Sequence, residues 1–81
     1  MEMVTGLSPW EVVMSDDSVL VVSASGYTDV GTDRVFTVLV DASIEEQASL
    51  EVISRTPNDP RRADVVLVRI PIAQIKSTVG G

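Results

Sequence analysis

The sequence predicts a small all-β domain with at most one short helical turn. Fifteen valines, five isoleucines and six threonines make up about a third of the 81 residues, and β-branched side chains favour a pleated sheet over a helix. Short apolar runs alternate with polar segments that contain Gly, Pro, Asn or Asp. The connections are too short for the crossover helices of a parallel sheet. We therefore expect five to six antiparallel strands in a meander-like order, closed into a small barrel or a compact sandwich.

Residues 10–14 and 19–24 are the first two predicted strands. The segment between them reads Ser-Asp-Asp-Ser, which is typical of a turn because Asp side chains accept hydrogen bonds from nearby backbone N–H groups. We expect these strands to form a hairpin. The chain is expected to be a single domain over residues 1–81, with frayed ends at residues 1–8 and 80–81.

Residues 25–33 are polar and contain two glycines that can adopt positive φ angles, so they are predicted to form a loop. Residues 34–42 give the clearest strand pattern. Alternation along this strand predicts one fully apolar face. The residues of that face are Phe36, Val38, Val40 and Ala42.

Ser43 and Glu46 match a capping box, in which the serine hydroxyl accepts from the N–H of residue 46 and the glutamate reaches back to the N–H of residue 43. One or two helical turns are expected to follow, and a helix this short depends on packing against the sheet. We expect Ile44 and Ala48 to provide that packing. Residues 50–55 are predicted to resume as a strand.

Residues 56–62 contain two prolines around Asn-Asp and are predicted to form a projecting loop. Residues 63–70 are apolar on both faces along their middle, which predicts a central strand. Pro71 ends this strand. The spacing of Ile72 and Ile75 predicts a single helical or 3₁₀ turn that buries both side chains, before residues 76–79 form a short edge strand.

Charge is unevenly distributed along the chain, whose net charge is −6. The first 51 residues hold ten acidic residues and one basic residue, whereas the last 30 hold two acidic and five basic residues. A soluble domain whose opposite charges meet after folding explains this pattern, since net charge governs solubility rather than fold. An acidic face that binds a cationic partner is the alternative.

Most enzyme chemistry is excluded by composition. The chain has no His and no Cys, so it lacks the base of a Ser-His-Asp triad, the thiol nucleophile and any Cys zinc site. The carboxylate pairs Asp16–Asp17 and Glu45–Glu46 lie in turn-like segments, where solvated charge is the simpler explanation. We therefore predict no enzymatic activity and no cofactor.

Two other kinds of site have weak sequence support. Asp29 and Asp33, near Tyr27, offer oxygen ligands for Ca²⁺ or Mg²⁺, but they lack the spacing with which one loop wraps a cation. We therefore predict no metal site. Nucleic acid is not an expected partner, because the sequence pI is about 4.2 and the three aromatic residues are far apart in the sequence.

Several predicted strands are apolar on both faces, yet the chain has only three aromatic residues to fill a core. Apolar surface that is left over needs a cover, and a second copy or another protein supplies one. We therefore predict a non-enzymatic protein-interaction or assembly module that forms homo-oligomers or docks on a larger protein. The alternatives are an acidic inhibitor or immunity-type protein and a small ligand- or cation-binding barrel.

Four parts of the chain are candidate interaction sites. Trp10 is either a lid on the core or an aromatic anchor, and the edge at residues 72–79 and the hairpin at 14–19 are candidates for strand addition by a partner. We define the basic tip as Arg55, Arg61 and Arg62. Contact between the acidic first half of one copy and the basic tip of another would give head-to-tail assembly. The predicted interaction residues are Trp10, Asp16, Asp17, Arg55, Arg61, Arg62, Ile72 and Ile75.

The amino terminus has no basic residue followed by an apolar core, so it does not resemble a secretory signal. No apolar run approaches the roughly 20 residues that span a bilayer. A cytoplasmic location, or assembly in a viral particle inside a host cell, is the expectation, with no membrane partner.

Overall fold

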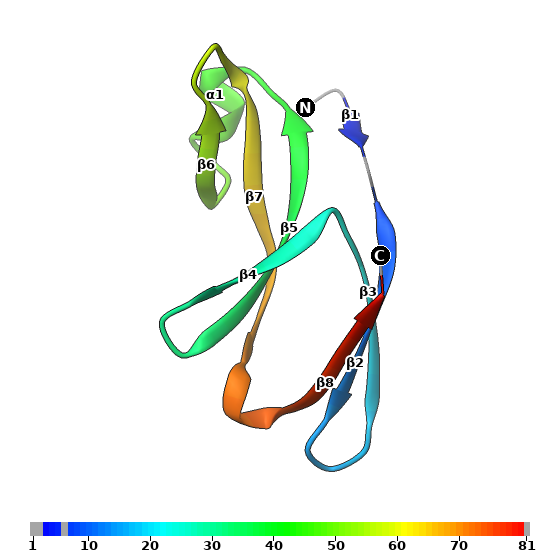
Figure 1. Cartoon of the computed structure of the whole chain (residues 1–81). Helices are drawn as coiled ribbons and strands as arrows, with labels where there is room; N and C mark the ends of the chain where they lie inside the picture. Colours follow the sequence, from blue (N-terminus) through cyan, green and yellow to red (C-terminus); the bar gives the residue numbers. More distant parts are fainter. Residues whose placement is uncertain (1–2, 6, 81) are drawn as a thin grey trace.

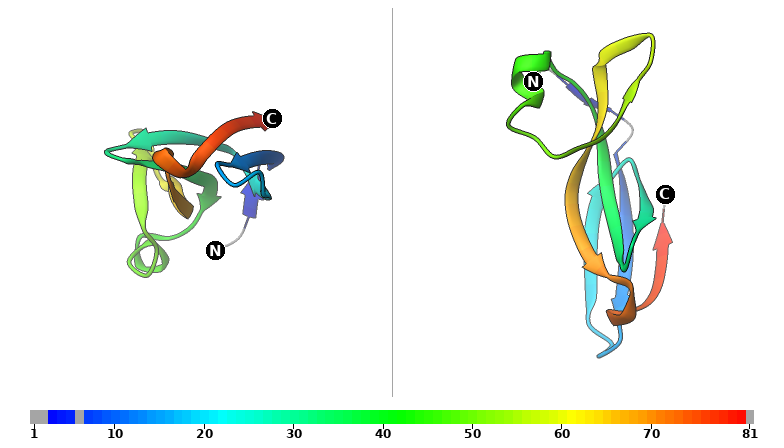
Figure 2. Two further views of the ribbon diagram at one scale, coloured as in Figure 1. Left: turned by 90° about the horizontal axis from the view of Figure 1, so that it is seen from below. Right: turned by 90° about the vertical axis from the view of Figure 1, so that its left-hand side faces the viewer.

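The structure, a computed structural model, describes residues 3–5 and 7–80 and confirms the all-β class. Figure 1 shows two antiparallel sheets, of which the larger is strongly curled. The molecule is elongated, with extents of 40 × 23 × 20 Å (Figure 2). The buried apolar residues therefore lie in separate clusters along the long axis of the molecule rather than in one round core.

The larger sheet is built on two long strands, β5 (Asp33–Asp41) and β7 (Asp59–Pro71), which pair along their length. The other edge of β5 pairs with β4 (Gly26–Val30) at its start and with β1 (Met3–Thr5) at its end. Strand β6 (Val52–Thr56) pairs with β7. The predicted strand at 63–70 is therefore central, because it lies between β5 and β6.

The smaller sheet has the order β3-β2-β8. Strands β2 (Ser8–Met14) and β3 (Val19–Ala24) form the predicted hairpin. The chain returns from β7 through a 3₁₀ turn, η1 (Ile72–Gln74), to β8 (Ile75–Gly80), which pairs with the other edge of β2. The predicted turn after Pro71 is thus confirmed, and segments from both ends of the sequence form one sheet.

The segment at 25–33 is not a loop, which corrects the sequence prediction. It forms β4 and a two-residue turn whose Gly31 has a φ of +61°. Tyr27 and Thr28 are residue types that favour strands, and Tyr27 gains contacts with Trp10 and Phe36 that no local pattern reveals. Tertiary packing therefore outweighs the polar composition of this segment.

The expected projecting loop at 56–62 is a two-residue turn instead, and residues 59–62 belong to β7. The register between β6 and β7 shifts after Arg55, so that Thr56 lies opposite Asp59 while Arg55 lies opposite Ala63. This irregularity leaves Pro60 outside the pairs with β6. A proline is tolerated in a strand at such a position because its missing N–H is not needed there.

The predicted capping box is present at α1 (Ile44–Gln47). Ser43 Oγ accepts from the Glu46 N–H at 3.1 Å, and Glu46 Oε1 accepts from the Ser43 N–H at 2.9 Å. The expected packing residues are wrong, since Ile44 is 54% exposed and Ala48 is also exposed. Gln47 is the residue that faces inward, and it is held by hydrogen bonds rather than by apolar contact.

The expected frayed ends are only partly within the described residues. Met3–Thr5 pairs with the end of β5, Ser8 begins β2, and Gly80 lies opposite Trp10 in β8. These three segments are strands rather than frayed ends. Residues 1, 2, 6 and 81 lie outside the described residues.

Among the residues whose burial is described, two apolar clusters form the core. The first fills the space between the two sheets and has Val12, Ala24, Phe36 and Ile70 at its centre. The second lies within the curled sheet near α1 and has Val38, Val40, Ala42 and Val65 at its centre. The predicted apolar face of residues 34–42 is therefore buried throughout, but it is shared between both clusters.

Candidate interaction surface

The smaller sheet has one face against the core and one face that is exposed. Val12 lies opposite Leu20 and Thr78 in the register and is fully buried. Alternate residues of a strand point to opposite faces. Glu11 therefore lies on the outer face, in a row between Val21 and Val79.

We call this outer surface the valine face; it comprises Val13, Val19, Val21 and Val79 around Glu11. Val21 is 65%, Val79 63% and Val19 54% exposed. Within the described part of the chain, β3 and β8 each pair only with β2, so each leaves an outer strand edge unpaired. An apolar face between two open edges is a surface to which a further strand or sheet can bind.

Trp10 belongs to an aromatic cluster that the sequence does not suggest. The centroid of its ring lies 5.4 Å from that of Tyr27, in an edge-on arrangement, and 6.4 Å from that of Phe36. The ring centroids of Tyr27 and Phe36 are 5.5 Å apart. The Trp10 indole N–H donates to the Ala24 carbonyl at 3.2 Å. Trp10 is half-buried and packs on the first core cluster, which is the position of a lid. Recognising the tight turn after Val30 would have placed Tyr27 opposite Phe36.

Arg34 links the two sheets and was not identified from the sequence. Its guanidinium donates to both carboxylate oxygens of Asp29, at 2.8 and 3.1 Å, and to Thr78 Oγ1 at 3.0 Å. It also lies 4.6 Å from the centre of the Tyr27 ring, which is a cation–π contact. The hydrogen bonds from Arg34 lower the pKa of Asp29 below its ordinary value, and those to Asp29 raise the pKa of Arg34.

The weak metal candidates Asp29 and Asp33 are not arranged as a cation site. Both oxygens of Asp29 already accept from a cationic side chain. Asp33 lies opposite Val30, at the turn of the β4–β5 hairpin. Within residues 3–5 and 7–80, no group of three or more carboxylates is placed to hold a metal ion.

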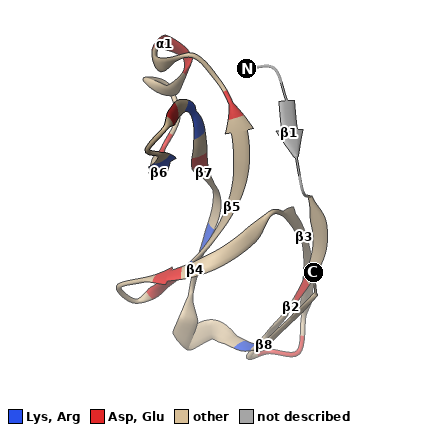
Figure 3. Cartoon of the chain, turned by 45° about the horizontal axis from the view of Figure 1, so that its top comes forward, with Lys and Arg blue, Asp and Glu red and all other residues tan. Residues whose placement is uncertain are grey.

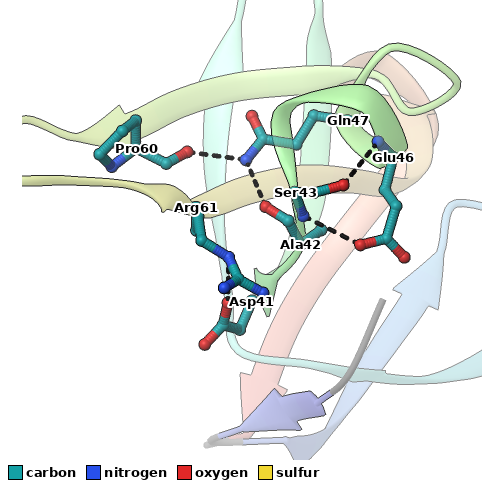
Figure 4. Close-up of polar contacts among 7 residues, drawn as sticks. All are labelled: Asp41, Ala42, Ser43, Glu46, Gln47, Pro60 and Arg61. Atoms are coloured by element: carbon teal, nitrogen blue, oxygen red, sulfur yellow. Dashed lines mark hydrogen bonds and ion pairs between the residues drawn. The ribbon is translucent and has the colours of Figure 1, made fainter.

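The basic tip of the sequence lies beside α1, where acidic residues are also present (Figure 3). Arg61 Nε lies 3.5 Å from Asp41 Oδ1 (Figure 4), and Arg62 lies opposite Asp41 in the register with β5. Arg55 Nε donates to Gln47 Oε1 at 2.7 Å. The tip is a surface of mixed charge.

Among the described residues, the acidic side chains do not gather on one face. Asp16 and Asp17 lie in the β2–β3 turn, at the opposite end of the molecule from Glu45 and Glu46 in α1 (Figures 1 and 2). Asp17 pairs with Lys76 at 2.7 Å. Ser18 donates to Asp16 through its hydroxyl and its backbone N–H, and these hydrogen bonds lower the pKa of Asp16.

Ile72 and Ile75 are both half-buried at the connection between the two sheets. Ile75 packs against the first core cluster. Their apolar side chains thus anchor the crossing from β7 to β8. Within residues 72–79, the outer edge of β8 is unpaired in the described chain, and Val79 is the large apolar side chain that is exposed.

No family model, curated protein or solved structure matches the chain. A search for membrane spans among the described residues finds no helix with the length and apolar character needed to cross a bilayer.

Proposed function

We propose that this chain is a non-enzymatic protein-interaction module that self-associates through the valine face. The main observation is that Val19, Val21 and Val79 are exposed together on the outer face of the β3-β2-β8 sheet. Solvent-facing strands ordinarily carry polar residues on their outer face. A sheet with apolar residues on both faces has the pattern of a strand layer that is covered on both sides.

A second copy of the chain is a suitable cover because it presents the same apolar surface. Two sheets that pack face to face lie about 10 Å apart and interdigitate their side chains. Burying one exposed valine contributes about 1.5 kcal/mol. Glu11 lies in the middle of the face, and registers that bring two Glu11 side chains together are disfavoured by like-charge repulsion. This repulsion favours an offset arrangement.

Other features support a structural rather than a catalytic role. The chain has no His and no Cys, and its two pairs of adjacent carboxylates lie at opposite ends of the molecule. The polar groups beside the aromatic cluster already interact with one another. Arg34 donates to both carboxylate oxygens of Asp29 and lies over the ring of Tyr27. We propose that the module is located in the cytoplasm, or in a viral particle that is assembled inside a host cell.

Light scattering tests the proposal directly. The expected mass is at least twice the 8.7 kDa of the chain, and it should persist at both low and high salt because apolar contacts are not screened. Loss of the oligomer at high salt alone would instead indicate head-to-tail assembly through charge. In that case charge reversal at Arg61 and Arg62 should abolish association.

Substitutions on the valine face make the test specific. Val21→Lys and Val79→Lys should each shift the mass toward 8.7 kDa, since a buried lysine opposes association. Val30→Lys is the matched control, because Val30 is a 45% exposed valine in the other sheet. A single-chain mass for the unsubstituted protein at every concentration would overturn self-association and turn the search to a different protein partner.

A further inference from the structure

The larger sheet carries a hollow on the face that does not contribute to the core clusters. Thr37 lies between Phe36 and Val38 in β5 and so points to the other face. The register places Gly26 opposite Thr37 and Ser54 opposite Asp64. Strands β4 and β6 therefore form the two rims of the hollow, and it has a volume of about 370 Å³.

The floor of the hollow contains a hydroxyl that makes no hydrogen bond to the described chain, and it belongs to Thr37. Thr37 is only 8% exposed. Its carbonyl accepts from the Ser25 N–H at 2.8 Å, but among the described residues its hydroxyl makes no hydrogen bond. A carbon atom added to Gly26, across from Thr37, would meet no other atom within 4 Å, so there is room for a partner above it.

The rim contains a carboxylate without a cation. Asp64 Oδ2 accepts from Ser54 Oγ at 3.1 Å. Unlike Asp17 and Asp29, Asp64 forms no ion pair with any Lys or Arg of the described chain. The hollow thus offers one negative charge together with the hydroxyl oxygens of Thr28 and Thr37.

We infer that this hollow binds a primary ammonium group, held by the Asp64 carboxylate and the hydroxyls of Thr28 and Thr37. An ammonium is compact and donates three hydrogen bonds in different directions, which suits acceptors on three separate strands. A guanidinium prefers both oxygens of one carboxylate, and Ser54 already occupies one of them. The hollow is in a different sheet from the valine face, so this inference does not depend on self-association.

The test uses the full chain, ¹⁵N-labelled, titrated with n-butylammonium chloride near neutral pH, with n-butanol as the uncharged control. Saturable shifts of the backbone amide signals of Gly26, Thr28, Thr37 and Ser54 are expected with the amine and not with the alcohol. A parallel titration with Nα-acetyl-lysine methylamide distinguishes the source: tighter binding of this compound indicates a lysine side chain of a polypeptide, and equal binding indicates a small free amine.

Two variants test the individual contacts. Asp64→Asn keeps the shape of the side chain and should raise the dissociation constant about tenfold, since a charge-assisted hydrogen bond is lost. Thr37→Val should raise it about threefold. Asp59→Asn, an exposed residue at the start of β7, is the control and should leave it unchanged.

The dispersion of the amide spectrum verifies that each variant is folded, and either Asp64→Asn or Thr37→Val is sufficient for the test. The inference is overturned if the amine gives no saturable shifts at the hollow. It is equally overturned if n-butanol binds as tightly as the amine, or if folded Asp64→Asn and Thr37→Val both bind the amine with unchanged affinity.

Discussion

At the residue scale, Gln47 connects three separate segments around α1. Its amide nitrogen donates to the carbonyls of Ala42 at 3.0 Å and Pro60 at 2.7 Å, and its oxygen accepts from Arg55 (Figure 4 shows the two donated bonds). The side chain is 2% exposed. It therefore provides the carbonyls of Ala42 and Pro60 with a donor that backbone pairing does not supply.

Replacing this amide should be costly. Gln47→Leu keeps the volume but leaves the two carbonyls without donors, so the free energy of unfolding should fall by about 2–4 kcal/mol. Urea denaturation followed by circular dichroism measures the change. Gln74→Leu, at an exposed glutamine in η1, is the matched control and should change stability by less than about 0.5 kcal/mol. Equal effects of both substitutions would contradict this role for Gln47.

The contact between Asp29 and Arg34 should make stability depend on pH. Arg34 lowers the pKa of Asp29 in the folded protein below the ordinary value of 3.8. A carboxyl whose folded pKa is lowered contributes stability that is present above its unfolded pKa and is lost as pH falls through its folded pKa. The contribution of Asp29 should therefore be complete at neutral pH and decline below about pH 4.

The urea midpoint, measured from about pH 7 to about pH 2.5, tests this dependence. Asp29→Asn should lower the midpoint at neutral pH and flatten its decline in acid, so that the curves of variant and parent converge at low pH. Arg34→Gln should flatten the same part of the curve, and the double variant should be no flatter than either single variant. A constant separation between Asp29→Asn and the parent over the whole range would contradict the assignment.

At the element scale, the backbone of β8 lies close to the backbone of β2 at Gly80, where the two strands pair. A Cβ atom added to Gly80 would lie 2.5 Å from the Pro9 carbonyl oxygen and 2.8 Å from the Trp10 Cα. Backbone atoms of a paired strand cannot move away without breaking ladder hydrogen bonds. The end of β8 therefore requires glycine, although the sequence suggested only a frayed terminus there.

Gly80→Ala should weaken the pairing of β8 and lower the free energy of unfolding by about 1–3 kcal/mol through this steric clash. Hydrogen exchange should show faster exchange of the β8 amides than in the parent. Gly26→Ala is the control, because a Cβ atom there meets nothing within 4 Å. Unchanged exchange in β8 of Gly80→Ala would show that the approach to Pro9 and Trp10 is not tight.

At the scale of the whole molecule, β5 and β7 form a spine that joins both core clusters. Phe36 and Ile70 belong to the first cluster, while Val38 and Val65 belong to the second. Strand β5 is paired on both edges, whereas β3, β6 and β8 each pair on one edge within the described chain. Local opening should therefore begin at the edge strands and leave the spine intact.

Native-state hydrogen exchange should show this order. The amides of Val38 and Val40 should have protection close to that of global unfolding, and those at the outer edges of β3 and β6 should exchange through small openings. If self-association through the valine face covers the edge of β3, its amides should gain protection as protein concentration rises, while those of β6 should not. Uniform protection across all strands would contradict the spine.

Much of the fold follows from local sequence. β-branched residues and alternation predict the strands at 10–14, 19–24, 34–42 and 63–70, and the Ser43–Glu46 pattern predicts the helix start. These features depend on residues close in the sequence, which act before any tertiary contact. The exposed valine face is partly predictable for the same reason, since several strands carry apolar residues on both faces in the sequence.

Tertiary structure decided the rest because the relevant contacts join residues far apart in the sequence. The strand at 26–30 depends on Tyr27 meeting Trp10 and Phe36, and the inward side of α1 depends on a carbonyl that β7 supplies. The pairing of β8 with β2 determines which valines are exposed together. The sequence by itself thus determined the strands and their apolar faces, whereas only the packing of the two sheets decided which faces remained open, because burial depends on long-range pairing.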